Sequence, residues 1–329
     1  MSRLIPESPI VLAPLAGGPS TPELVAAVSN AGGLGFLAAG YLQPQVFAEQ
    51  LARTRELTRK PVGVNVFVLE EVAVDGEAIA AYAHALEPEA RARGVRLGEP
   101  RFDDDWLTEK LEVIVRADVD VVSTTFGCLA AATVGRLQES GTRVWATITS
   151  PDEARAAQAA GVDALVVQGG EAGGHSGAWR DDGESTPLSE LLASVDVGLP
   201  LIATGGLADR DGVRAALAAG AQAAQIGTAF LLCPEAGTSE AHRRALRAGG
   251  ETAFTRAFTG RSARAIVNRF MIDHPAAPVA YPHIHHLTAP LRAAARAAGD
   301  ADGINLWAGE NFGRTKQAPA AAIVAALGP

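Results

Sequence analysis

The sequence predicts an α/β protein, a TIM (β/α)8 barrel with a smaller, mostly helical substrate or cap domain. Eight short apolar runs of strand length alternate with longer segments of helical period over roughly the first 230 residues. Strands and helices in alternation imply parallel strands with right-handed crossovers. No well-placed G-x-G-x-x-G opens a helix after the first run, so the competing doubly wound sheet is disfavoured.

The eight expected strands are short and rich in β-branched or small apolar residues. They are residues 10–14 (IVLAP), 34–38 (LGFLA), 62–66 (VGVNV), 120–124 (DVVST), 143–148 (RVWATI), 163–168 (DALVVQ), 199–204 (LPLIAT) and 222–227 (QAAQIG).

Helix signals follow several of these strands. Residues 21–30 have Ser20 or Thr21 as the N-cap and Pro22 at the first helical position. Residues 150–160 repeat the pattern, with Glu153 three residues after Ser150 as in a capping box. Residues 209–219 end at Gly220, a typical helix stop.

Two segments do not fit the repeat. Residues 69–105 are too long for a simple βα connection and contain the helix-like stretch EAIAAYAHALEPEARARG. The tail after about residue 233 adds HRRALRAGG, a loop rich in Pro and His (HPAAPVAYPHIHH) and LRAAARAAG. We therefore expect a barrel of residues 1–68 and 106–234, which binds the cofactor, and a helical cap of residues 69–105 and 235–329.

Composition narrows the function classes. The chain has 329 residues, 48% of them hydrophobic, and a formal net charge of −9. This acidity argues against nucleic acid or an anionic membrane as a partner. The two cysteines have no zinc or CxxC spacing, and neither a signal peptide nor a transmembrane run is visible, so we expect a cytoplasmic protein. The oligomeric state is open, with a homodimer as one option.

Glycines end the seventh and eighth strands, where TIM barrels frequently bind phosphate. The seventh ends in Gly205 and Gly206, and the eighth in the run Gln225, Ile226, Gly227, Thr228. Bare backbone N–H groups there would allow phosphate oxygens to approach, and a following helix N-terminus would add positive potential. One glycine pair alone would indicate only a tight turn, but two pairs at both expected positions predict a phosphate site.

Uncharged polar groups surround the expected barrel mouth. Pro14 and Leu15 follow the first strand, Asn65 lies on the third, Thr147 on the fifth and Gln168 on the sixth. Such donors and acceptors suit a flat ring with amide edges, such as a flavin, better than a sugar or a metal. Taken singly, Asn65 and Gln168 could equally be satisfied interior hydrogen-bonding groups.

The stretch QGGEAGGHSG, residues 168–177, follows the sixth strand. Its glycines, among them Gly173, would allow backbone to lie against a ring face. His175 would then project over that face, where a neutral imidazole is a suitable general base. Glu171 has no evident role.

Other candidate sites are weaker. The spacing of His283, His285 and His286 is unspecific for a metal, and we expect no metal site. The run Asp103–Asp105 is expected to be a solvated loop. No G-x-S-x-G elbow supports serine hydrolase chemistry.

Several of these motifs, in this order, resemble the nitronate monooxygenases, formerly called 2-nitropropane dioxygenases. They are APLAGGPSTPELVAAVSNAGGLGFL, GVNVFV, QGGEAGGHSG, IATGGLAD and AQIGTAFL, and the likeness continues into TRAFTGRSARAIVNRF and GINLWAGE, which resemble the bacterial branch. EAGGH is the most specific single element.

The resemblance implies an FMN-dependent enzyme that oxidises an alkyl nitronate, such as propionate 3-nitronate, with O₂ to a carbonyl compound and nitrite. Asn65, Gln168, Gly173, Gly206 and residues 225–228 match positions that bind FMN. His175 matches the catalytic histidine, which would hold the nitro-group oxygens in its charged form or act as the base toward a neutral nitroalkane.

The chain departs from the family pattern at three positions. Leu15 stands where many relatives carry Met, Thr147 where some carry Lys, and Glu310 where Gln is expected. The change at Thr147 removes a cation from near the flavin.

Two alternatives stay open. Flavin-dependent enoyl-acyl-carrier-protein reductases, which use NAD(P)H, share the GVN, EAGGH and GG elements, although the NLWAGE segment favours the branch that uses O₂. A non-catalytic flavin or phosphate-ligand binding protein would keep the glycine sites and leave His175 incidental.

Overall fold

The computed structural model describes residues 8–329, and its central feature is a barrel of eight parallel strands. The strands are β1 (Ile10–Leu12), β2 (Gly35–Ala38), β3 (Val62–Phe67), β4 (Val121–Thr125), β5 (Arg143–Ile148), β6 (Ala164–Gln168), β8 (Leu201–Thr204) and β9 (Ala223–Ile226). Their order in the sheet is β1-β9-β8-β6-β5-β4-β3-β2. A parallel bridge between Val11 and Leu34, with Leu12 N donating to Leu34 O at 2.9 Å, joins β1 to the start of β2 and closes the barrel. The predicted TIM barrel and its eight strands are confirmed.

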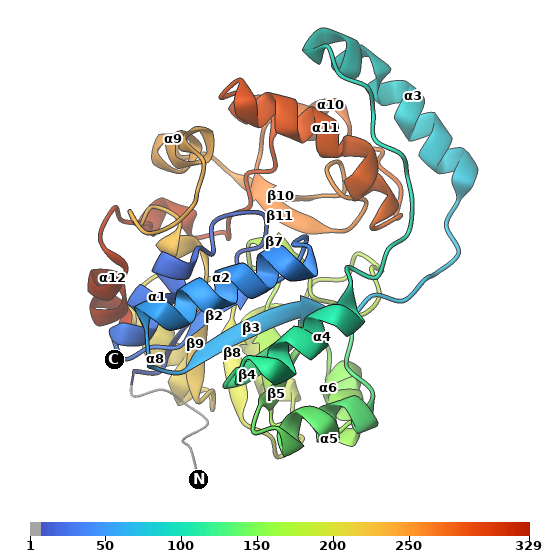
Figure 1. The fold of residues 1–329 in the computed structure, drawn as a ribbon. Helices are drawn as coiled ribbons and strands as arrows, with labels where there is room; N and C mark the ends of the chain where they lie inside the picture. Colours follow the sequence, from blue (N-terminus) through green and yellow to red (C-terminus); the bar gives the residue numbers. More distant parts are fainter. Residues whose placement is uncertain (1–7) are drawn as a thin grey trace.

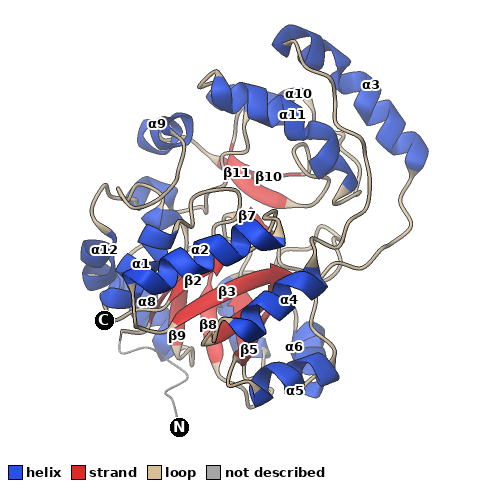
Figure 2. Cartoon of the chain, viewed as in Figure 1, coloured by secondary structure: helices blue, strands red, loops and turns tan. Residues whose placement is uncertain are grey.

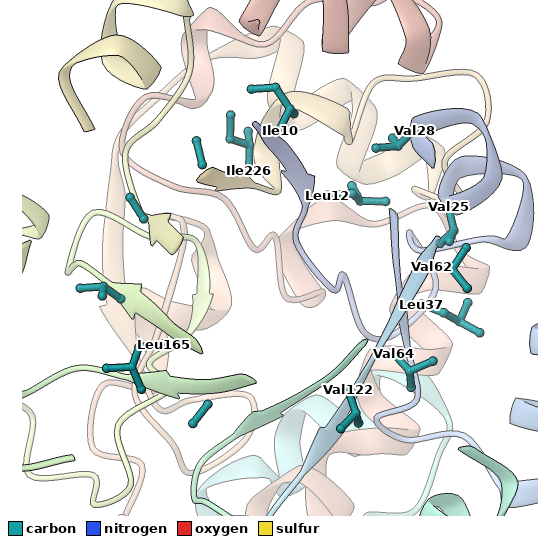
Figure 3. Close-up of a cluster of buried hydrophobic side chains, with 14 of the residues drawn as sticks. Ile10, Leu12, Val25, Val28, Leu37, Val62, Val64, Val122, Leu165 and Ile226 are labelled. Carbon is teal, nitrogen blue, oxygen red and sulfur yellow. The ribbon is translucent and has the colours of Figure 1, made fainter. Parts of the chain in front are cut away.

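Helices cover the outside of the barrel (Figures 1 and 2). They are α1 (Pro22–Asn30), α2 (Pro44–Leu57), α4 (Leu107–Arg116), α5 (Ala131–Glu139), α6 (Pro151–Ala159), α7 (Leu188–Ser194), α8 (Arg210–Ala218) and α12 (Ala320–Leu327), with a short 3₁₀ turn η1 (Thr228–Phe230) after β9. Figure 3 shows part of the apolar layer between helices and strands, with Val25 and Val28 of α1 close to Leu12 of β1 and Val62 of β3.

The helix starts follow the sequence signals with one difference. Thr21 caps α1 by accepting from Leu24 N, and Ser150 caps α6 by accepting from Glu153 N. The Glu153 carboxylate, however, accepts from Thr149 N at 2.6 Å instead of returning to Ser150, so the capping box is shifted by one residue.

The alternation of side chains along each strand divides the barrel into two apolar layers. Alternate residues such as Ile10, Leu12 and Val64 join the outer layer beneath the helices. The residues between them fill the barrel interior, and this inner cluster consists of Val11, Leu34, Phe36, Val121, Trp145, Ala164, Val166, Ile202 and Ala223. The next inward positions toward the carboxyl ends are polar: Asn65, Thr147, Gln168, Thr204 and Gln225. A layer of polar side chains therefore lies above the apolar side chains that fill the barrel interior.

The remaining elements group together at one end of the barrel (Figure 1). They are α3 (Gly76–Arg93), α9 (Glu240–Ala248), α10 (Arg269–Asp273), α11 (His283–Ala297), η2 (Ala301–Gly303), η3 (Phe312–Arg314) and a sheet of β10 (Thr252–Thr255), β11 (Ala263–Ile266) and β7 (Gly174–His175). Tyr82 and Leu86 of α3 share an apolar cluster with Ile284 and Leu291 of α11, so the insertion and the tail pack on each other.

Two features of this region differ from expectation. The small sheet was not predicted, because β10 and β11 are short and β7 has only two residues. The expected loop over HPAAPVAYPHIHH was wrong at its end, because His283–His286 form the first turn of α11. No helix within residues 8–329 is long and apolar enough to cross a membrane.

Candidate active site

One cavity lies at the carboxyl ends of the barrel strands, and every residue predicted for the site lines it. Its empty space, including the part open to solvent, is about 1260 Å³. The predicted residues are Pro14, Leu15, Asn65, Thr147, Gln168, Gly173, His175, Gly205, Gly206, Gln225, Ile226, Gly227 and Thr228.

The polar layer forms the base of the cavity, and its amides are used differently. Asn65 Nδ2 donates to Ser123 Oγ at 2.9 Å and Thr125 Oγ1 at 3.0 Å, which orients the amide along β4. Both polar atoms of the Gln168 amide bind the following loop. Oε1 accepts from Gly177 N at 2.6 Å, and Nε2 donates to His175 O at 3.2 Å. Gln225 Oε1 is buried without any hydrogen-bond partner within the described chain. A buried acceptor without a partner lowers the stability of the folded protein. Gln225 Oε1 is therefore available to accept a hydrogen bond from a ligand.

The glycine-rich end of the cavity offers backbone groups. Gly205 and Gly206 have φ of 117° and 69°, which other residues rarely adopt. Asn311 Nδ2 donates to Gly206 O at 2.7 Å, and Gly309 N donates to Thr228 Oγ1 at 3.0 Å, so the tail closes over this end.

A helix N-terminus follows β8, as expected, but it is already capped. Asp209 caps α8 by accepting from Gly212 N, which occupies that N-terminus with a carboxylate. After β9 there is only the three-residue turn η1. Hydroxyl and backbone N–H groups are thus the groups available to donate hydrogen bonds to a phosphate.

Several glycines of residues 169–177 lie against other protein segments. A Cβ at Gly173 would lie 2.4 Å from Gly309 N, one at Gly169 would lie 2.6 Å from Leu188 N, and one at Gly177 would lie 2.7 Å from Thr147 Cγ2. These glycines allow protein segments to approach the loop closely, while Gly173 and Gly174 also line the cavity.

Two acidic residues without a sequence-derived role hold this loop. Glu171 accepts from Leu188 N at 3.1 Å, which caps the start of α7. Glu310 pairs with Arg264 at 2.9 Å, and Arg264 also donates to Gly170 O at 2.8 Å. The departure at Glu310 therefore supplies an ion pair within the tail, to the arginine that also holds the loop through Gly170 O.

His175 lines the same cavity in an aromatic enclosure. Its ring centroid is 5.2 Å from that of Trp307, 5.7 Å from that of Tyr281 and 5.8 Å from that of Phe126. Its Nε2 is 2.8 Å from Thr259 Oγ1. β7 pairs with β11, which fixes His175 opposite Ala263.

The imidazole of His175 is neutral at ordinary pH. Burial among the aromatic rings is the main cause, and the charges of Arg261 and Arg292 add to it, so the pKa of His175 falls to about 3. The charge of Asp181 raises the pKa of His175, but this carboxylate already forms a bidentate ion pair with Arg256. The charged form of His175 is therefore disfavoured before an anion binds.

Among the described residues, no charged side chain lines the cavity. Two arginine side chains, Arg261 and Arg292, lie behind the residues that do line it. The Arg261 guanidinium is 4.1 Å from the Phe126 ring centre and donates to Ser176 O and Ala178 O. Arg292 donates to Thr288 Oγ1 and His285 O. Neither arginine forms an ion pair with any carboxylate within residues 8–329. Arg261 and Arg292 consequently contribute positive potential at His175, although the chain carries a net negative charge.

Several lining residues were missed by the sequence reasoning. Tyr41 and Phe126 follow β2 and β4 and have φ of 69° and 74°; such strain in bulky residues is typical of functional sites. Their place at strand ends is a signal that could have found them. Trp307, Asn311 and Thr315 come from the tail and carry no such signal.

The acidic run at residues 103–105 is a loop that is only partly solvated, because Asp104 is exposed and Asp105 is buried. Asp105 is 2.6 Å from Lys110 Nζ, both side chains are buried, and Asp105 Oδ1 accepts from Tyr41 N at 2.9 Å. Asp103 contacts His286 Nε2 at 2.6 Å. The run thus supports the left-handed backbone of Tyr41 from behind the cavity.

The three histidines of the HIHH segment form no metal centre. His285 stacks on Tyr41 with ring centres 4.3 Å apart, and its Nδ1 lies 3.2 Å from Arg292 Nη2. Within the part of the chain that the structure describes, no three His, Cys, Asp or Glu side chains are grouped to hold a metal ion.

Comparisons with known proteins agree on one family. A family model described as nitronate monooxygenase matches residues 1–328. A nitronate monooxygenase of Paraburkholderia phytofirmans is 38% identical over 98% of this chain and 91% of its own length. A crystal structure of nitroalkane oxidase from Streptomyces ansochromogenes is 46% identical, with a TM-score of 0.95 over 98% of this chain and 95% of that one. FabK from Thermotoga maritima is 25% identical, with a TM-score of 0.77 over 98% and 92%.

Proposed function

The chain belongs to the nitronate monooxygenase family and is an oxidoreductase, and we propose that it oxidises alkyl nitronates with O₂ by means of bound FMN and His175. The observation that carries this proposal is a cavity, among the described residues, that is lined by two unlike sets of groups. Glycines and hydroxyl groups form one set, and a neutral histidine in an aromatic enclosure belongs to the other. A long ligand held by the first set would extend over the polar layer toward His175.

The family is flavin-dependent, and the residues present fit FMN. Gln225 Oε1 is a buried acceptor without a donor, which the N–H edge of a flavin ring would supply. Gly206, Gly227 and Thr228 would receive the phosphate through backbone N–H and hydroxyl groups. When bound, the flavin would carry electrons from the nitronate to O₂.

Replacing Gln225 by leucine is expected to have opposite effects on the free protein and on FMN binding. It removes a buried acceptor without a partner, so the protein without FMN should unfold at a higher temperature, while the FMN Kd rises about tenfold through loss of one hydrogen bond. Differential scanning fluorimetry and fluorescence titration with FMN measure the two effects. Gln222→Leu, at an exposed position just before β9, is the matched control. An unchanged FMN Kd in Gln225→Leu would remove Gln225 from the cofactor site.

The low basicity of His175 favours nitronates over neutral nitroalkanes. A nitronate is already an anion and loses electrons without prior proton removal. A neutral nitroalkane must first give its α-proton to a base, and an imidazole whose pKa is about 3 accepts one reluctantly. The positive potential from Arg261 and Arg292 also favours the anion. Nitrite release and O₂ uptake with propionate 3-nitronate test the reaction, and absence of both would refute the proposal.

The pH dependence should show no histidine transition near pH 6.5. Because the pKa of His175 is lowered, its imidazole is neutral above about pH 3. The groups that face it do not titrate between pH 5 and pH 8, since the pKa of Asp181 is lowered, that of Tyr281 is raised and the guanidiniums stay charged. The kcat/KM for a preformed nitronate salt, measured before it reprotonates, should therefore show no transition of His175 from pH 8 to pH 5. A fall centred near pH 6.5 that is absent in His175→Asn would contradict this assignment.

A further inference from the structure

The neighbour of His175 that matters most for its chemistry is Thr259. Its hydroxyl lies 2.8 Å from His175 Nε2 and also 3.3 Å from the carbonyl oxygen of Arg261. A carbonyl oxygen only accepts, so the Thr259 proton is used in the bond to Arg261 O. The Thr259 oxygen then has only lone pairs for His175, and both bonds are made together only when His175 Nε2 carries the imidazole proton.

The other ring nitrogen, Nδ1, is consequently the free one. It makes no hydrogen bond within the described chain, and the His175 side chain lines the cavity. In the neutral ring, a proton on Nε2 leaves a lone pair on Nδ1.

Thr259 is itself rigidly held. Its side chain is buried in the turn between β10 and β11, where Gly260 N donates to Arg256 O at 2.8 Å. Arg256 in turn binds Asp181 through two bonds of 2.9 Å, and Asp181 accepts from Ser262 N at 3.0 Å. A hydroxyl on so fixed a turn is suited to orienting a ring.

We propose that Thr259 is a positioning residue that holds neutral His175 as the Nε2–H form, so that Nδ1 is the atom presented to the substrate. The effect of this tautomer on catalysis rests on the proposed function. Which nitrogen of His175 carries the proton is a property of the protein without substrate. Nδ1 with a lone pair can accept the α-proton of a neutral nitroalkane; the C–H electron pair then stays on the substrate, which becomes the nitronate. A nitronate that enters preformed does not need this step. Loss of the Thr259 hydroxyl should therefore lower the rate of oxidation of neutral nitroalkanes and change that of preformed nitronates much less.

The direct test is the protonation state of His175 in the full chain with ¹⁵N-labelled histidine. Long-range ¹H–¹⁵N correlation spectra of the wild-type protein and of His175→Asn identify the His175 signals by difference. We expect Nε2 to be protonated and Nδ1 to be unprotonated at pH 7.5. A protonated Nδ1 would overturn the proposal, and this result does not depend on whether the protein turns over any nitronate.

The functional test compares Thr259→Val with Thr259→Ser. The isosteric valine removes the hydroxyl and should lower kcat/KM for nitroethane by about 10–100-fold, as for other groups that orient a functional histidine, while kcat/KM for ethyl nitronate stays within about threefold. Serine keeps the hydroxyl and should restore nitroethane turnover. Thr255→Val, on β10 and bonded only to Ala257 N, is the matched control. Equal losses with both substrates, or wild-type nitroethane turnover in Thr259→Val, would contradict a role in setting the tautomer.

Discussion

Replacing His175 by asparagine is expected to lower kcat/KM for nitroethane by about 10²-fold, the lower end of the contribution of a positioned base, because a pKa of about 3 makes the imidazole a weak base. The same change should affect ethyl nitronate by about tenfold or less, because a preformed nitronate has no proton to lose. Asparagine is polar and smaller than histidine, so the aromatic enclosure of Phe126, Tyr281 and Trp307 should persist.

Initial rates with both substrates, alongside the FMN content of each preparation, measure this effect. His84→Asn is the control, because His84 is exposed on α3 and far from the cavity lining. If nitroethane turnover in His175→Asn stayed at the wild-type level with FMN bound, His175 would have no catalytic role. A loss of FMN along with activity would instead make it a cofactor-binding residue.

Replacing Lys110 by methionine is expected to lower the free energy of unfolding by about 3–5 kcal/mol, because it leaves a buried carboxylate without its partner. Lys110 and Asp105 are 2.6 Å apart, and both side chains are buried. Burial already raises the pKa of Asp105 and lowers that of Lys110. Removing the cation would push Asp105 further toward its neutral form and weaken its hold on Tyr41 N.

Urea unfolding at pH 7.5 measures this loss. The double variant Lys110→Met with Asp105→Asn removes both charges and keeps an acceptor for Tyr41 N, so it should recover most of the stability. Arg116→Met removes an exposed cation from the same helix and should change the stability little. If the double variant were as unstable as Lys110→Met, lost packing would explain the effect better than an uncompensated charge.

The barrel was predictable because its signals are local. Each strand is a short apolar run, and the alternation of inward and outward side chains places Asn65, Thr147, Gln168 and Gln225 on the inner face of the barrel, where they line one cavity. Those residues could be assigned to one site from the rule that TIM-barrel sites lie at the carboxyl ends of the strands.

What the sequence could not show depends on contacts between distant segments. Thr259 and Trp307 reach His175 from the tail, more than 80 residues further along the chain. The glycines after Gln168 also give clearance to protein segments, such as Ala308–Gly309, that are equally remote in the chain. Asp105 looked solvated because nothing in an acidic run indicates a buried lysine five residues later.

The boundaries of the cap domain remain a prediction. The apolar cluster shared by α3 and α11 explains why an insertion and a tail so far apart in the chain pack together. The same arrangement brings Tyr281 and Arg292 toward His175. The positive potential that Arg292 contributes there is thus a product of tertiary structure rather than of a sequence motif.

The measurement that most directly tests nitronate oxidation is anaerobic reduction of the flavin in the purified protein. Propionate 3-nitronate and NADH are added separately to the FMN-loaded protein without O₂, and the flavin absorbance is followed in a stopped-flow instrument. We expect propionate 3-nitronate to bleach the flavin and NADH to leave it oxidised on the same timescale. Rapid bleaching by NADH, with none by the nitronate, would contradict the proposed function and favour a reductase that uses NAD(P)H.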